Sequence, residues 1–187
     1  MKKGTSKNKG SAFERFLGRE LSLWWTNGED RNIFMRSASS GAWNTMHRNE
    51  GVSAHAGDIE AADRKGKLFT DKVMVEAKWY KSEQSLLFEV LLSKRSQILE
   101  WWTKCELEAT DMRKIPLLVV KFNYQIPFIV LPNYFYSEIY KTYGDPPIKS
   151  HLMAELNFDD TVYKYIVIMR FDNFLNWCKP ELFKGGK

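Results

Sequence analysis

The residues best suited to chemistry lie in the stretch VMVEAKWYK, residues 73–81. Apolar and polar side chains alternate along it, which predicts a β-strand with two unlike faces. Glu76 and Lys78 point to the same face, and their Cα atoms lie about 6.5 Å apart in an extended strand. The other face is expected to be buried and carries Val73, Val75, Ala77 and Trp79. A carboxylate and an ammonium placed this way can act on one ligand.

A second predicted strand, GDIEAAD (residues 57–63), carries another carboxylate, Asp58. The segment RKGK, residues 64–67, predicts a turn that would pair this strand with residues 73–81 as an antiparallel hairpin. Asp58 would then lie beside Glu76.

Two carboxylates and a lysine that face one space suit a divalent cation, because Mg²⁺ prefers oxygen ligands and leaves room for phosphate oxygens. A metal ion there would polarise a phosphoryl group and lower the pKa of a bound water, while the lysine would orient that water. The alternative is that Glu76 and Lys78 form only the solvated face of a half-buried strand. Taken alone, such a pair more commonly has this structural role.

A third carboxylate, Glu14, lies in the segment SAFERFLGRELSLWW (residues 11–25), whose apolar side chains have helical spacing. Ser11 and Glu14 fit a capping box, in which the glutamate bonds back to the first amide of the helix. Glu14 also lies at the edge of the apolar stripe and leans toward whatever the helix packs on. Either a capping role or a place in the site is consistent with this pattern.

The remaining pattern predicts helices and strands in a mixed order. Further strands are expected at residues 32–37, 115–122, 127–132 and 163–170, and helices at residues 86–109, 133–144 and 171–177. This order predicts an α/β or α+β domain with a mixed central sheet flanked by helices. The 187 residues are divided into a flexible basic tail (1–10), a core (11–131) and an extension packed on the same domain (132–187).

Lys and Arg outnumber Asp and Glu by 28 to 23, and the tail is rich in lysine. A basic arm favours binding to a polyanion, and it is equally typical of a solubilising tail. No apolar run approaches the roughly 18 residues of a membrane span, and no signal peptide is expected, so we predict a cytoplasmic protein without a membrane partner. Cys105 and Cys178 are expected to be reduced and structural.

Four short motifs follow one another in the order found in archaeal-type Holliday junction resolvases, relatives of which also occur in viruses. The motifs that resemble this family are KGSAFER (residues 9–15), RSASSG (36–41), GDI (57–59) and VEAK (75–78). The GD ahead of the EAK strand also resembles the pattern of the PD-(D/E)XK nuclease superfamily, with Gly57 where the name has proline. The resemblance covers about residues 9–125 and implies a restriction-endonuclease-like fold.

The resemblance implies a role for each matching residue. Asp58 and Glu76 would be the principal metal ligands. The backbone carbonyl of Ala77 would assist them, and Glu14 would complete the metal shell. Lys78 would orient the attacking water. The residues that would meet DNA are Lys9, Arg15, Arg36, Ser40 and Gln97.

The function implied is a Mg²⁺-dependent DNA endonuclease that resolves Holliday junctions as a homodimer, with Mn²⁺ as the alternative metal. The protein would act in the cytoplasm of a bacterial, archaeal or virus-infected host cell. One alternative is a less structure-selective nuclease of viral replication, packaging or restriction. Another is a catalytically idle DNA-binding protein of the same fold.

Overall fold

The computed structural model describes residues 6–37, 57–81, 97–158 and 162–185. Ser40 and the first part of the helix predicted at residues 86–109 lie outside the described residues.

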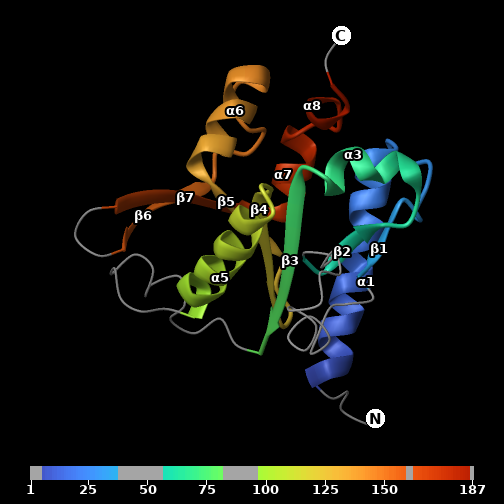
Figure 1. Ribbon diagram of the computed structural model, residues 1–187, viewed down its shortest axis with the longest axis horizontal. Helices are drawn as coiled ribbons and strands as arrows, with labels where there is room; N and C mark the ends of the chain where they lie inside the picture. The colour runs from blue at the N-terminus through green and yellow to red at the C-terminus, as the bar shows by residue number, and fades with distance from the viewer. Residues whose placement is uncertain (1–5, 38–56, 82–96, 159–161, 186–187) are drawn as a thin grey trace.

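A mixed five-stranded sheet forms the centre of the protein (Figure 1). Its strands lie in the order β3 (Val73–Tyr80), β4 (Ile115–Phe122), β5 (Phe128–Pro132), β7 (Val162–Arg170) and β6 (His151–Phe158). β3 and β4 are parallel, and the other neighbours are antiparallel. Helices pack on both faces, which confirms the predicted mixed sheet flanked by helices and its restriction-endonuclease-like architecture. The sequence analysis missed β6.

The first helix, α1, spans Ser6–Trp25 and so begins earlier than its apolar pattern predicts. Ser11 lies inside this helix, whereas the serine of a capping box is the non-helical residue at the helix start. The interpretation of Ser11 and Glu14 as a capping box is therefore wrong. Residues 6–10, expected in the flexible tail, are helical because packing of an apolar face stabilises a helix and lets it extend into a polar segment.

The predicted hairpin is replaced by a small two-stranded sheet. β1 (Phe34–Arg36) pairs antiparallel with β2 (Ile59–Ala61). The chain then forms a 3₁₀-helix, η1 (Arg64–Gly66), and a short helix, α3 (Lys67–Thr70). The prediction that β2 pairs with β3 is wrong, because these two helical segments separate the strands where a tight turn was expected.

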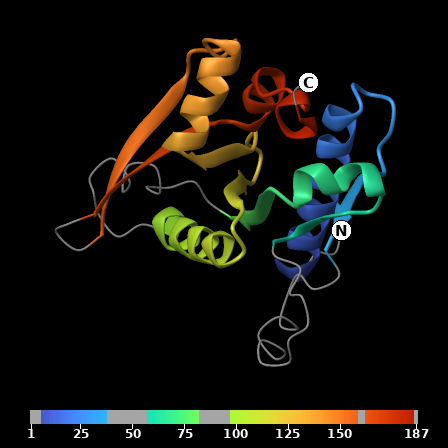
Figure 2. The ribbon, with the colours of Figure 1, turned by 45° about the horizontal axis from the view of Figure 1, so that its top comes forward.

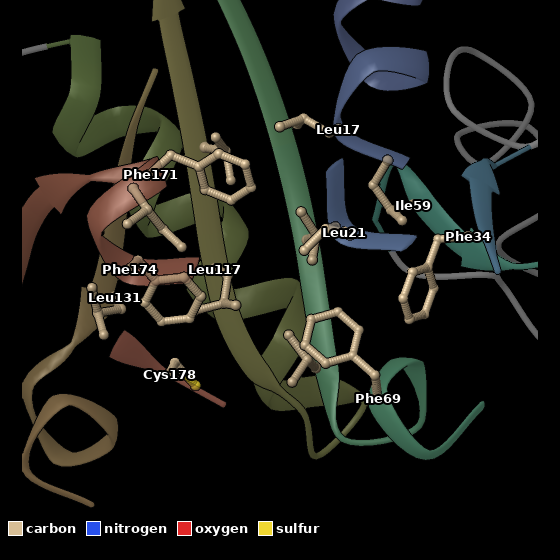
Figure 3. Close-up of a cluster of buried hydrophobic side chains, with 14 of the residues drawn as sticks. Leu17, Leu21, Phe34, Ile59, Phe69, Leu117, Leu131, Phe171, Phe174 and Cys178 are labelled. Atoms are coloured by element: carbon tan, nitrogen blue, oxygen red, sulfur yellow. The ribbon is translucent and has the colours of Figure 1, made fainter. Parts of the chain in front are cut away.

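The larger core lies on the face of the sheet that α1 covers (Figure 3). The α1 side chains that fill it are at most 3% exposed and are Phe13, Leu17, Leu21 and Trp25. Phe69 of α3 and alternate residues of β3 pack against them. The same core receives side chains from α6 (Asn133–Tyr143), α7 (Phe171–Trp177) and α8 (Glu181–Lys184). Truncating a buried leucine of this kind typically lowers stability by about 2–5 kcal/mol, so α1 is held firmly in place.

The opposite face of the sheet is covered by α5 (Gln97–Asp111). Its Trp102 and Cys105 are at most 1% exposed and pack in one cluster with Met74 of β3 and Leu118 of β4. Met74 lies on the same face of β3 as Glu76 and Lys78, and it is fully buried. β3 is therefore covered on both faces, and its polar residues face the side of the sheet on which α5 packs.

None of the described helices combines the length and apolarity needed to cross a bilayer. Cys105 and Cys178 are both free and buried, as expected. Burial raises the pKa of both thiols, which keeps them protonated and unreactive.

Candidate active site

Asp58 is held against the free edge of β3. The Asp58 N–H donates to the Val75 carbonyl at 2.8 Å, and the Ala77 N–H donates to Asp58 Oδ2 at 2.8 Å. The N–H and C=O of one strand residue point to the same side, so the carbonyl of Ala77 faces this edge as well. Asp58 thus reaches β3 although its own strand pairs with β1.

Gly57 allows this contact. Its φ is +86°, and a Cβ added there would lie 2.7 Å from the Val75 carbonyl oxygen and 3.0 Å from Met74 Cγ. Proline, whose φ is fixed near about −65°, cannot adopt this backbone. The glycine found where the superfamily name has proline is therefore required by the way the chain approaches β3.

Replacing Gly57 with alanine is expected to displace Asp58, to abolish cleavage and to lower the thermal midpoint by several degrees. A left-handed backbone costs a non-glycine residue about 1 kcal/mol or more. Each kcal/mol shifts the midpoint by about 2–4 °C in a chain of this length. Gly28→Ala is the matched control, because Gly28 has φ +93° with no atom within 4 Å of its added Cβ. Equal losses of stability in both variants would contradict a role for the close approach to β3.

Glu76 and Lys78 form an ion pair on the α5 side of β3. Their side chains are 12% and 28% exposed, so the alternative of a simple solvated face does not describe them. Burial lowers the pKa of Lys78, but the Glu76 carboxylate outweighs this effect and leaves the pKa raised. Lys78 is therefore an ammonium, which can donate hydrogen bonds and offset negative charge.

Glu14 forms an ion pair with Arg36 of β1. The Arg36 Nε donates to the Glu14 carboxylate, whose side chain is 13% exposed. The next residue, Ser37, donates its N–H to the Asp58 carbonyl at 2.8 Å, which ties the end of β1 to Asp58. The inward lean predicted for Glu14 is observed, and its partner there is a guanidinium.

The surroundings of Asp58 raise its pKa from 3.8 to about 7. Burial is the largest cause, followed by repulsion from Glu76, and Glu14 adds to it. The Ala77 N–H and the Lys78 ammonium act in the opposite direction. A concentration of carboxylates that raises a pKa in this way is compensated when a cation binds among them.

The donor types present fit a hard divalent cation. Among the described residues, no three His, Cys, Asp or Glu side chains are arranged so that they could hold a metal ion. Glu14 and Glu76 are instead paired with cationic side chains. Mg²⁺ is commonly bound through only one or two carboxylates, together with waters and substrate phosphates. Asp58, Glu76 and the Ala77 carbonyl provide such a set of oxygen donors.

The other residues predicted to meet DNA differ in their surroundings. Lys9 and Arg15 are exposed on α1. Gln97, at the start of α5, donates to Glu100 of the same helix at 2.8 Å. Ser40 is not among the described residues.

An open groove of about 590 Å³ lies between α1 and the segment that leads into β1. We call it the arginine groove, because it is lined by Arg15, Arg19, Arg31 and Arg36. The sequence analysis missed Arg19 and Arg31. The spacing of Arg15 and Arg19, one helical turn apart, was a usable signal. Arg31 lies outside the helices and strands, and its position follows no periodic pattern.

A family model described as "Phage putative PDDEXK endonuclease" matches residues 5–185. The chain belongs to this family. Searches of curated proteins and of solved structures find no match. The superfamily expected from the motifs is thereby confirmed, and the protein is a nuclease of the PD-(D/E)XK type, with DNA as the implied substrate.

The family match extends to residue 185, whereas the resemblance to resolvases ended near residue 125. The letters D and EXK of the superfamily name were expected at Asp58 and at Glu76–Lys78. The structure brings the two parts together through the Ala77 N–H and the Asp58 carboxylate.

Proposed function

We propose that this nuclease cleaves DNA by metal-dependent hydrolysis and that Asp58, Glu76 and Lys78 form its reacting centre. The observation that best supports this is the Asp58 carboxyl, bonded to the Ala77 N–H beside the acidic and basic residues of the motif. Partly buried charges of this kind are weak contributors to stability, and apolar residues of similar size often stabilise a fold as well. A chemical role accounts for them better.

Mg²⁺ would be held by Asp58, Glu76 and the Ala77 carbonyl, with Mn²⁺ as the alternative. When bound, the ion would supply Lewis-acid activation of the phosphodiester. Lys78, kept protonated by Glu76, would hold the attacking water and offset the negative charge that develops on the phosphate. The Ala77 N–H would keep the Asp58 carboxyl at the edge of β3.

We further propose a four-way DNA junction as the preferred substrate and a homodimer as the active form. The order of the motifs between Lys9 and Lys78, which resembles that of Holliday junction resolvases, supports this substrate. Symmetric cuts in two strands need two centres related by a twofold axis, which a C₂ dimer supplies.

The test compares a labelled four-way junction with a linear duplex of the same arm sequences, in Mg²⁺ and in EDTA. We expect paired symmetric cuts in the junction, much slower cutting of the duplex, and no cutting in EDTA. Light scattering should give the mass of a dimer. Equal cutting of both DNAs would contradict junction selectivity and favour the less selective nuclease. DNA that is bound but left uncut in Mg²⁺, and also when Mn²⁺ replaces Mg²⁺, would favour the idle DNA-binding protein.

A further inference from the structure

The arginine groove has four arginines and five uncharged residues in its lining, and no acidic residue. Arg15 and Arg19 lie one turn apart on α1, where like charges destabilise a helix. Within the described parts of the chain, Arg15, Arg19 and Arg31 form no ion pair. Folding alone does not account for such a concentration of positive charge, and an anionic ligand does.

α1 and β1 approach each other closely enough to form one surface. Gly18 has no side chain, and a Cβ there would lie 3.1 Å from the Phe34 carbonyl oxygen and 3.3 Å from Met35 Cα. The Phe34 N–H also donates to Ser22 Oγ of the helix at 2.8 Å. Figure 1 and Figure 2 both show α1 and β1 side by side, away from α5. The arginines of the two segments therefore face one groove.

The lining favours a sugar–phosphate backbone over bases. A guanidinium binds phosphate oxygens through paired hydrogen bonds and stays charged at any physiological pH. The two aromatic rings of the lining are already covered: Phe34 is 3% exposed, and the Lys121 ammonium lies 5.4 Å from the Phe16 ring centroid. Bases that bind in grooves usually stack on open aromatic faces. Repeated positive charges match the regularly spaced phosphates of DNA instead.

Arg36 connects the groove with the active site. It lines the groove and donates to the Glu14 carboxylate. It lies opposite Ile59, the residue after Asp58, in the register of β1 and β2. A phosphate in the groove would compete with Glu14 for the same guanidinium.

We propose that the arginine groove holds the DNA backbone next to the bond that is cut, and that a phosphate seated there takes Arg36 from Glu14. The Glu14 carboxylate, which lies near Asp58, then loses its ion pair with Arg36 and can act as a further oxygen ligand. DNA binding and completion of the reacting centre are coupled through one ion pair. This inference rests on the proposed function, because it assigns the groove to the DNA substrate of the same site.

The first experiment measures binding of a labelled duplex in EDTA over a series of salt concentrations, so that cleavage does not contribute. The slope of log K against log salt is negative, and each phosphate contact adds about 0.9 to its absolute value, which is the slope compared among the variants. We expect Arg19→Ala and Arg31→Ala each to lower this slope by about 1 and to weaken binding several-fold, and Arg19→Lys to keep the slope. Arg113→Asn is the matched control, because it removes an exposed arginine outside the groove at φ 55°, which asparagine tolerates.

Equal slopes for wild type, groove variants and control would overturn the groove assignment, and so would wild-type protein that binds no DNA. The measurement does not depend on cleavage, so the two proposals can fail separately. If the groove variants show the expected slopes but wild type cuts no DNA, the groove assignment stands and the hydrolytic mechanism is overturned. If wild type cuts DNA but the groove variants have the same slopes as wild type, the hydrolytic mechanism stands and the groove assignment is overturned.

The second experiment tests the competition for Arg36 with a double-mutant cycle. Glu14→Gln should raise DNA affinity in EDTA, because it releases Arg36, and the same change should have little effect beside Arg36→Gln. Arg36→Lys provides a second background in which the paired Nε–H is absent and the charge is kept. An equal gain in all backgrounds would mean that Glu14 acts only through its negative charge, and it would overturn the competition. A lack of any gain in the wild-type background would do the same.

Discussion

Replacing Glu76 with glutamine is expected to lower the rate of DNA cleavage by about 100-fold or more, the usual effect of removing one group that stabilises a transition state electrostatically. Glutamine has the size of glutamate and can still accept a hydrogen bond from Lys78. The change removes the negative charge that pairs with the Lys78 ammonium and that would hold the proposed metal ion. The fold should stay intact, because the side chain is only partly buried and its shape is kept.

The measurement is single-turnover cleavage in Mg²⁺ with saturating DNA, together with DNA binding in EDTA. We expect the rate to fall while DNA affinity and the thermal midpoint stay close to those of wild type. Glu138→Gln, an exposed glutamate on α6, is the matched control for the loss of one carboxylate. A Glu76→Gln protein that cuts as fast as wild type would remove Glu76 from the reacting centre.

Replacing Asp58 with asparagine is expected to stabilise the metal-free protein at neutral and alkaline pH. Burial and then repulsion from Glu76 raise the pKa of Asp58 from 3.8 to about 7. Between these pH values the folded protein binds a proton that the unfolded chain does not bind, so wild-type stability falls as the pH rises. The loss reaches about 4 kcal/mol at most, because each pKa unit corresponds to about 1.4 kcal/mol. Asparagine removes this penalty and can still accept the Ala77 N–H through its carbonyl oxygen.

The measurement is the free energy of unfolding in denaturant, with EDTA, at several pH values between about 4 and about 8. The difference between Asp58→Asn and wild type should grow with pH across this range. Adding Mg²⁺ should raise the wild-type thermal midpoint and leave that of the variant unchanged, because only wild type retains the ligand. Asp111→Asn, an exposed aspartate at the end of α5, is the matched control. Parallel pH profiles for wild type and Asp58→Asn would contradict the raised pKa, and an unchanged wild-type midpoint in Mg²⁺ would count against the metal site.

Local side-chain patterns were sufficient to predict most elements. The alternation in residues 73–81 predicted β3, the apolar runs near residues 115–122 and 127–132 predicted β4 and β5, and helical spacing predicted α1. Each of these signals depends on neighbours within one or two turns or strand steps, so no partner has to be known. The placing of Glu76 and Lys78 on one face of β3 belongs to this group, because they lie two residues apart on one strand, whereas Asp58 lies on a separate segment.

Strand pairing could not be obtained in this way. β2 pairs with β1, although its sequence neighbour in the predicted hairpin was β3. β6 was missed, and the strand that it pairs with among the described residues is β7. The alternation of β3 also does not reveal that α5 covers the face that carries Met74. Pairing and covering depend on where all elements bury their apolar surfaces, and that is a property of the whole chain.

The residues of the proposed reacting centre can therefore be picked out as candidates in the sequence, whereas the contacts among them come from the tertiary structure. Asp58 contacts β3 because Gly57 has a positive φ, and this backbone conformation is known only from the tertiary structure. The ion pair of Glu14 with Arg36 joins α1 to β1, and residues from α1 and from the segment that ends in β1 line the arginine groove. Charges that lie far apart in sequence act together only after the core has set the positions of α1, β1 and β3, because electrostatic interactions depend on distance in space and not on separation along the chain.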